Sequence, residues 1–195
     1  MSKKKTNPNK VPISGDSVDS QKIIIDFIGK MVLTAWLLVL GALADFVETT
    51  SKSIESLWME VNAFADIVHD SNHVTKSMKY LKTITGVSIP YEHLLTKQIR
   101  TKGDLDKFTQ HAKKNALYIA LAVIAGAIAE KALLSEEDSS LVFCKAFDLN
   151  DEILEKRISL SDIQNMLADE YSIYLYEVNG QVKLSIHSTP REIDN

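Results

Sequence analysis

The residues whose types and spacing best suit metal chemistry are Asp66, His69 and His73, separated by three and four positions. On an unbroken helix this spacing places one carboxylate and two imidazoles on one side, as a metal ion requires. Ser71 and Asn72, however, are typical of a helix stop followed by a new cap, and they fall between the two histidines. The sequence therefore favours ordinary surface histidines, and it predicts no metal site and no cofactor.

Residues for nucleophilic or phosphoryl chemistry are equally sparse. Cys144 is the only cysteine, so the chain has no internal disulfide and no cysteine-based zinc site, which favours a reducing compartment. Bundle-type ribonucleases place a histidine four to six residues after an arginine, whereas His111 follows Arg100 by eleven. Phosphate-binding glycine loops, nucleophile elbows and zinc-protease helices do not occur either. No catalytic residue is predicted, and the sequence favours a protein that is not an enzyme.

Charge is distributed unevenly along the chain. The 195 residues include 22 basic and 26 acidic ones, a net charge of −4. Up to Lys114 there are 16 basic and 12 acidic residues, a net of +4, and beyond it 6 basic and 14 acidic ones, a net of −8. The two halves are therefore expected to meet different surroundings.

The most apolar stretch lies at residues 23–47, after a basic tail at 1–19 that is expected to be disordered. The apolar run starts far from the first residue, is too long, and lacks a small-x-small cleavage site before the next helix, so no cleaved signal peptide is expected; an uncleaved anchor is the alternative. Within the stretch, apolar side chains point in every direction around a helix, so the helix needs enclosure by protein or by lipid. The predicted membrane or core positions are Val32, Leu33, Trp36, Leu37, Leu38, Val39, Leu40 and Leu43.

Further helices are predicted up to residue 134, including ones at 54–68, at 74–84 before Gly86, and at 88–99. The final helix before residue 134 is a second apolar helix near 116–134, which is rich in alanine and glycine. Ala122, Gly126 and Ala129 fall near one face of it, which would let another helix approach closely. This face predicts tight packing, either with the first apolar helix or with a second copy of the chain.

A boundary is predicted near residue 134, followed by a small α+β module at 135–195. Residues 141–147 suggest a strand and 150–156 a short helix, and Ser161 with Gln164 suggests a capping box for another helix. Asn179-Gly180 between two alternating segments predicts a hairpin that pairs Leu175 with Leu184. The predicted fold is mainly α, a helical bundle with two strongly apolar helices followed by a C-terminal α+β module with a β-hairpin.

A helix followed by a hairpin resembles part of a winged helix, which would imply DNA binding. Charge argues against this, because a recognition helix presents Arg and Lys to the nucleic acid. The predicted helix instead carries Asp162, Asp169 and Glu170. The module is therefore interpreted as a structural or protein-binding unit.

Basic residues gather between the two apolar helices. Residues 71–115 hold nine of them against three acidic residues, a net of +6. A solvated bundle face is one interpretation; contact with anionic lipid is the other, with RNA as an alternative ligand. The residues are Lys76, Lys79, Lys82, Lys97, Arg100, Lys102, Lys107, Lys113 and Lys114.

Two functional hypotheses follow. The first is a self-associating membrane-associated protein, an anchor, scaffold or membrane-perturbing component whose C-terminal module binds a partner in the cytoplasm. A span needs about 20 apolar residues, a length that the first stretch approaches. Lysines on both sides of that stretch nevertheless conflict with the positive-inside tendency. The alternative is a soluble, cytoplasmic helical-bundle interaction protein with both apolar helices in its core.

Overall fold

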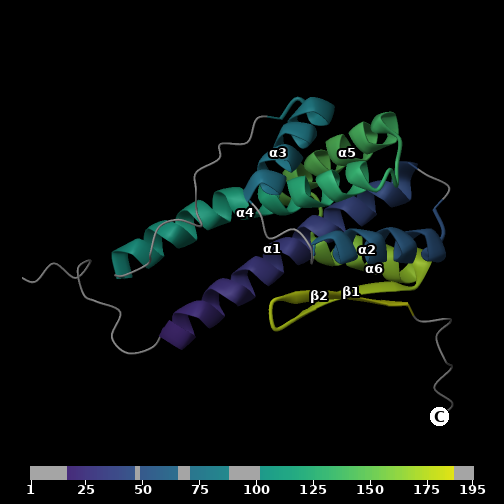
Figure 1. Cartoon of the computed structure of the whole chain (residues 1–195). Coiled ribbons are helices and arrows are strands. Elements are labelled where there is room, and N and C mark those ends of the chain that lie inside the picture. The colour runs from purple at the N-terminus through teal and green to yellow at the C-terminus, as the bar shows by residue number, and fades with distance from the viewer. Residues whose placement is uncertain (1–16, 47–48, 66–70, 88–101, 187–195) are drawn as a thin grey trace, which may run out of the picture.

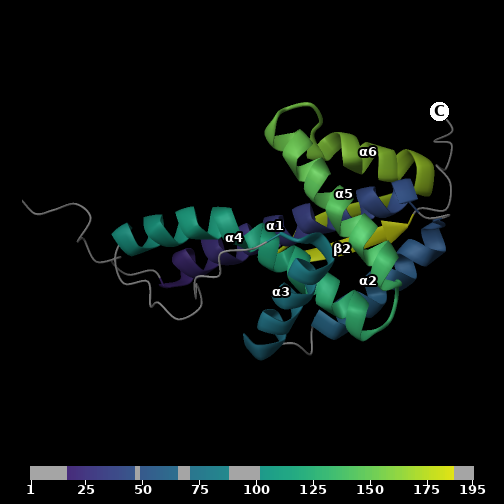
Figure 2. The ribbon, with the colours of Figure 1, turned by 90° about the horizontal axis from the view of Figure 1, so that it is seen from above.

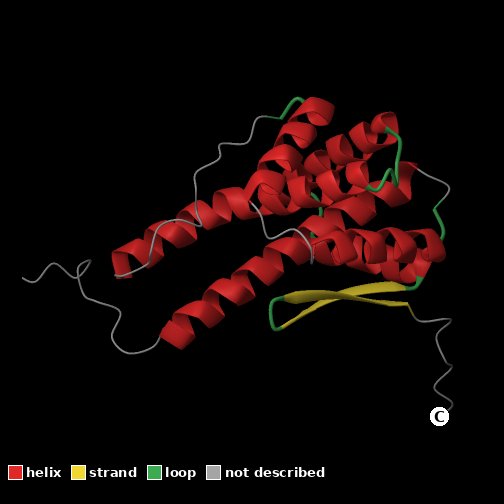
Figure 3. Ribbon diagram, in the orientation of Figure 1, coloured by secondary structure: helices red, strands yellow, loops and turns green. Residues whose placement is uncertain are grey.

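The structure, a computed structural model, describes residues 17–46, 49–65, 71–87 and 102–186. These residues form six helices and one two-stranded antiparallel sheet, which confirms the predicted fold class. Helices account for most of the described chain, and the strands are confined to the hairpin (Figure 3). The elements are α1 (Ser17–Phe46), α2 (Ser51–Ala65), α3 (Ser71–Thr85), α4 (Lys102–Glu130), α5 (Glu136–Leu154), α6 (Leu160–Tyr171), β1 (Ile173–Val178) and β2 (Gln181–Ile186).

Helix α1 is the central element of the molecule. It contacts α4, α5, α6 and both strands, and the hairpin lies beneath it along the lower face in Figure 1. Seen from above, α3 and α6 lie on opposite sides of α1 (Figure 2). The N-terminal ends of α1 and α4 extend beyond the other elements on the same side of the molecule.

The N-terminal helices follow the predicted pattern with shifted ends. Helix α1 begins at Ser17, inside the predicted tail, and α4 ends at Glu130 rather than near 134. Helix α3 ends where Gly86 adopts a φ of 72°, the left-handed conformation that glycine supplies at a helix end. The rest of the predicted tail and the predicted helix at 88–99 lie outside the described residues.

The predicted strand at residues 141–147 is wrong, because these residues lie inside the 19-residue helix α5. Its buried positions, Ser139, Val142, Phe143, Ala146 and Leu149, recur at helical spacing. The polar segment that follows the predicted boundary starts this helix, since the Ser135 side chain accepts a hydrogen bond from the Asp138 backbone N–H. Three acidic residues in the first turn favour the helix N-terminus electrostatically. The short helix predicted at 150–156 is not a separate element: residues 150–154 are the end of α5, and Glu155 and Lys156 form the turn that follows.

The capping box of α6 lies two residues before the predicted one. Ser159 is the N-cap, and its hydroxyl accepts from the Asp162 backbone N–H at 3.2 Å. The Asp162 carboxylate accepts from the Ser159 backbone N–H at 2.7 Å, which completes the reciprocal pair. Because the Ser159 hydroxyl and backbone N–H both donate to this carboxylate, the pKa of Asp162 lies below its usual value.

The hairpin has the predicted register, with Leu175 opposite Leu184 and Ile173 opposite Ile186. Asn179 and Gly180 have φ values of 53° and 81°, as a type I′ turn requires. Gln164 occupies the free edge of β1: its side-chain amide donates to the Ile173 carbonyl and accepts from the Leu175 N–H, each at 3.2 Å. The side chain thereby replaces a neighbouring strand at that edge.

The buried side chains form one hydrophobic core cluster that joins the N-terminal helices to α5, α6 and β1. Phe143, Leu167 and Ile173 belong to the same cluster as Trp36 and Leu38. The division of the chain near residue 134 stays a prediction from the sequence, but the two sides of that boundary share this core.

Candidate interaction surfaces

The predicted membrane or core positions of α1 divide into two groups. Trp36, Leu37, Leu38, Val39, Leu40 and Leu43 are buried, and every residue from 35 to 43 is buried with them. Val32 and Leu33 are only half-buried, and Ile25 and Ile28 nearer the N-terminus are 49% and 44% exposed. The C-terminal half of α1 is therefore enclosed by protein, and its N-terminal half is partly open.

Glycines allow the close contacts on which this enclosure depends. A methyl group added at Gly41 would lie 2.9 Å from a methyl carbon of Ile163 in α6. One added at Gly29 would lie 2.7 Å from the Cα atom of Gly180 in the hairpin turn. These separations are below van der Waals contact, so α6 and the turn need glycine at both positions of α1 to approach this closely.

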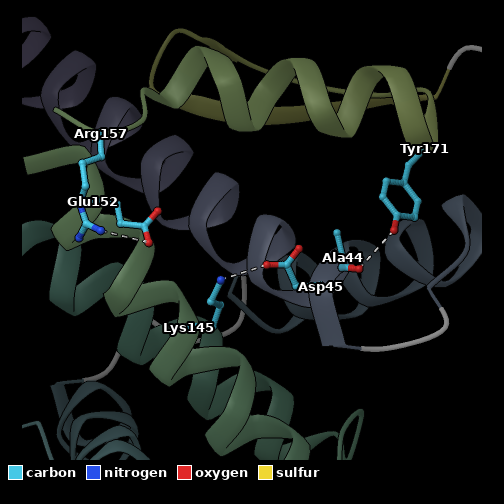
Figure 4. Close-up of polar contacts among 6 residues, drawn as sticks. All are labelled: Ala44, Asp45, Lys145, Glu152, Arg157 and Tyr171. Carbon is cyan, nitrogen blue, oxygen red and sulfur yellow. Dashed lines mark hydrogen bonds and ion pairs between the residues drawn. The ribbon is translucent and has the colours of Figure 1, made fainter.

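Polar contacts tie the C-terminal elements to the end of α1 (Figure 4). Lys145 Nζ of α5 lies 3.2 Å from a carboxylate oxygen of Asp45. The Tyr171 hydroxyl donates to the Ala44 carbonyl at 3.4 Å. The hydroxyl of Ser51, the first residue of α2, donates to the Tyr171 carbonyl at 2.5 Å. The side chains of Lys145 and Asp45 are 29% and 52% exposed, so solvent screens their attraction. The polar links are thus few and partly solvated.

The small-residue face of α4 packs within the chain. Ala122 is fully buried, and Gly126 and Ala129 are half-buried. A methyl group added at Gly126 would lie 2.7 Å from the Cβ atom of Ser77 in α3, so α3 is the helix that approaches there. Self-association through this face stays a prediction, and in the folded chain α3 already occupies the position next to Gly126.

The basic positions are described only in part. Lys76, Lys79 and Lys82 are exposed on α3, where they form a stripe at three-residue spacing. Residues 71–87 contain no acidic residue, and these three lysines make no ion pair within the described ranges. Lys102, Lys107, Lys113 and Lys114 lie on the N-terminal half of α4, whose side chains are not described. Lys97 and Arg100 lie outside the described residues.

The C-terminal elements carry the opposite charge. Residues 135–186 hold eleven acidic and four basic residues, a net of −7. On α5, Glu137, Asp148 and Asp151 are exposed, and so is Glu155, which follows the end of the helix. Exposed apolar residues on this part of the molecule are Leu141, Leu154 and the outer face of β1, namely Tyr174, Tyr176 and Val178.

An open depression of about 450 Å³ lies where α5 meets α6. Most of its polar lining is already engaged: Arg157 pairs with Glu152 and Glu155, and Ser159 and Asp162 cap α6, while the remaining polar residue is Lys156, an exposed cation. A nucleophile with a free base is therefore not found in this depression, and the described residues contain no group of three or more side chains that could hold a metal ion. Asp66 and His69 fall outside the described residues, and His73 is half-buried on α3.

Several residues that organise these surfaces were not found from the sequence. Gly29, Gly41 and Gln164 act across elements distant in the chain, so neither helical nor strand periodicity reveals them. The lysines of α3 could be found, because a helix with an apolar stripe must expose its remaining positions.

By length and composition, one helix among the described residues could cross a membrane: Ile25–Asp45, 21 residues, more than half of it buried inside the protein. The apolar part of α4, Asn115–Glu130, is shorter. The core helix of a soluble protein and a signal sequence can have the same length and apolar composition. No protein-family model, curated protein or solved structure matches the chain.

Proposed function

We propose that the protein is a helical bundle that acts by association at anionic membrane surfaces, which it contacts through α3. In this proposal it is a cytoplasmic protein bound to the membrane, an anchor or scaffold, and its C-terminal elements remain available for a protein partner. The observation that carries the proposal is the stripe of Lys76, Lys79 and Lys82, exposed on a helix whose segment has no acidic residue.

The energetic argument is electrostatic. A Lys near an anionic leaflet gains about 1 kcal/mol, so the three lysines of the stripe contribute roughly 3 kcal/mol at low salt. Lysines on α4 would add to this gain. The attraction declines as the Debye length falls to about 3 Å near 1 M salt. The binding is therefore expected to be reversible and sensitive to salt.

The test is flotation of purified protein with vesicles of phosphatidylserine in phosphatidylcholine, compared with phosphatidylcholine alone. Replacing Lys76, Lys79 and Lys82 with Glu should remove most flotation on anionic vesicles. The matched control replaces Lys52, Lys156 and Lys183, exposed on other surfaces, and changes the net charge equally. Equal loss in both variants, or equal flotation with neutral vesicles, contradicts the proposal. Tighter binding to RNA than to any vesicle would assign the stripe to nucleic acid.

The second candidate is a soluble interaction protein that does not bind membranes. The burial of residues 35–43 by the chain's own elements favours it, because a helix so enclosed needs no lipid. Its partner surface would be the outer face of the hairpin, where Tyr174, Tyr176 and Val178 are exposed. Absence of binding to anionic vesicles at low salt by a folded, soluble protein would favour this candidate.

A further inference from the structure

We propose that α5, α6 and the hairpin form a removable cover over α1, and that on an anionic membrane this cover separates so that α1 enters the bilayer. The C-terminal cover is defined as residues 136–186. The inference rests on the proposed binding to anionic membranes and adds what happens after the protein arrives there.

Helix α1 contains an apolar segment long enough to span a lipid bilayer. Ile25–Asp45 comprises 21 residues, and a hydrocarbon core needs about 20. Ile25 and Ile28 are already exposed in its N-terminal half, which together with the N-terminal half of α4 extends beyond the other elements in Figure 1. Lipid can therefore contact the N-terminal half of α1 before any other element moves.

Helix α1 cannot be packed against the cover and inserted in a bilayer at the same time. Residues 35–43 are buried, and α1 packs against the cover on one side and against α4 on another. Helix α5 of the cover exposes Glu137, Asp148 and Asp151 on its outer surface. Several carboxylates on one helix are too costly to place in hydrocarbon. The C-terminal half of α1 therefore cannot meet lipid on all sides while the cover remains in place.

An anionic membrane acts in opposite directions on α3 and on the cover. An anionic leaflet attracts the lysines of α3 and repels the C-terminal cover, because residues 135–186 have a net charge of −7. Of the cover, α6 lies on the side of α1 opposite α3 in Figure 2, whereas α5 packs against α3, so that its carboxylates would lie closer to the leaflet that attracts the lysines. The membrane that holds α3 thus disfavours the cover.

Apolar packing is the main contact that holds the cover against α1. The buried apolar residues of the cover, such as Phe143, Ile163 and Leu167, belong to the same core cluster as those of α1, and Ile163 and Leu149 lie against Gly41. Water cannot replace these contacts, but lipid chains can, because hydrocarbon solvates an apolar helix as well as leucine side chains do. Among the described residues, the polar links from the cover to the other helices are those of Lys145 to Asp45, of Tyr171 to Ala44 and Ser51, and of the Ser140 hydroxyl to the Ile84 carbonyl. The cover is therefore stable in water and replaceable at a bilayer.

A reversible disulfide between α1 and α6 tests the inference. The methyl position of Gly41 lies 2.9 Å from a methyl carbon of Ile163, so cysteines at both positions can approach the about 4 Å Cβ separation of a disulfide. The variant combines Gly41→Cys and Ile163→Cys with Cys144→Ser. Trp58→Phe leaves Trp36 as the only tryptophan, and Trp36 is buried in α1.

The readouts are vesicle flotation and quenching of Trp36 fluorescence by phosphatidylserine-containing vesicles with brominated acyl chains. The reduced protein should float, and brominated lipid should reduce its Trp36 emission at least twofold relative to unbrominated vesicles. The oxidised protein, the matched control, should float to the same extent with Trp36 emission unchanged. Circular dichroism before lipid is added establishes that both forms are folded.

The outcomes separate the two proposals. Equal quenching in oxidised and reduced protein overturns the cover, because α1 then meets lipid without separation. Flotation without quenching in the reduced form also overturns it, and leaves surface binding intact. Absence of flotation overturns the proposed function. The Trp58→Phe protein with Gly41, Ile163 and Cys144 retained is measured in parallel, so that lack of Trp36 quenching there contradicts insertion even if the cysteine variant misfolds.

Discussion

Leu38 is fully buried at the centre of α1, in the enclosed run of residues 35–43. Replacing it with Arg places a charge among apolar side chains, at an expected cost of more than about 4 kcal/mol. Since a domain of this size has a total stability of about 5 to 15 kcal/mol, the Leu38→Arg protein should unfold or aggregate as a whole.

The control is Leu154→Arg, because Leu154 is 71% exposed at the end of α5. Its melting temperature should match that of the wild type, while Leu38→Arg loses the cooperative melt. If Leu38→Arg instead yields a soluble protein whose α5, α6 and hairpin remain folded, the core described for α1 is incorrect.

Asp162 gives a residue-scale prediction about pH. Its pKa is lowered in the folded protein by the hydrogen bonds from Ser159, the side-chain hydroxyl contributing most. The ionised carboxylate therefore stabilises the fold above the ordinary carboxyl pKa, and this contribution is lost as the pH falls through the lowered value. Asp162→Asn should melt below the wild type near neutral pH, and the difference should shrink as the pH falls from about 6 to about 3. A difference that does not change over this range would contradict the assigned hydrogen bonds.

At the scale of elements, the contact between α3 and α4 depends on the absence of a side chain at Gly126. A Cβ atom there would lie 2.7 Å from the Cβ atom of Ser77, and such overpacking typically costs about 1 to 3 kcal/mol. Gly126→Ala should therefore lower the free energy of unfolding, despite the higher helix propensity of alanine.

A double-mutant cycle isolates this contact. Ser77→Gly removes the atoms that the new methyl group would meet first, so Gly126→Ala should cost clearly less in that background. The measurement is the free energy of unfolding in urea for the four proteins. Additive effects would mean that the two helices do not approach at these residues. A change in oligomer size without a change in monomer stability would instead place the face between copies of the chain.

Local signals in the sequence explain which elements were predicted correctly. Asn179-Gly180 has few backbone alternatives to a type I′ turn, so the hairpin and its register followed from short-range information. Residues 141–147 alone favour a strand, because they include Val142, Phe143 and Phe147, residue types that are enriched in sheets. Burial along the whole length of α5 shows the helical period that this short segment does not. The predicted cap at Ser161 failed for a related reason, since Ser159 offers an equivalent pattern one half-turn earlier.

At the scale of the whole molecule, the surroundings of α1 could not be predicted from its own residues. A helix that is apolar all round fits a dry core and a bilayer equally well. In the structure the surroundings depend on α5 and α6, amphipathic helices whose apolar sides cover α1 and whose outer sides carry acidic residues. If residues 141–147 formed a strand instead of part of α5, a helix that packs against α1 would be missing. The burial of α1 therefore cannot be predicted until α5 is identified.

In water, other elements of the same chain bury the C-terminal half of α1, and no lipid is needed to cover it. The most direct test is to express the full chain without detergent, separate soluble protein from carbonate-washed membranes, and measure the mass and dispersity of the soluble fraction. We expect a monodisperse, cooperatively melting protein in that fraction, with Trp36 protected from aqueous quenchers. Recovery of nearly all the protein in carbonate-washed membranes, extractable only with detergent, would contradict the claim.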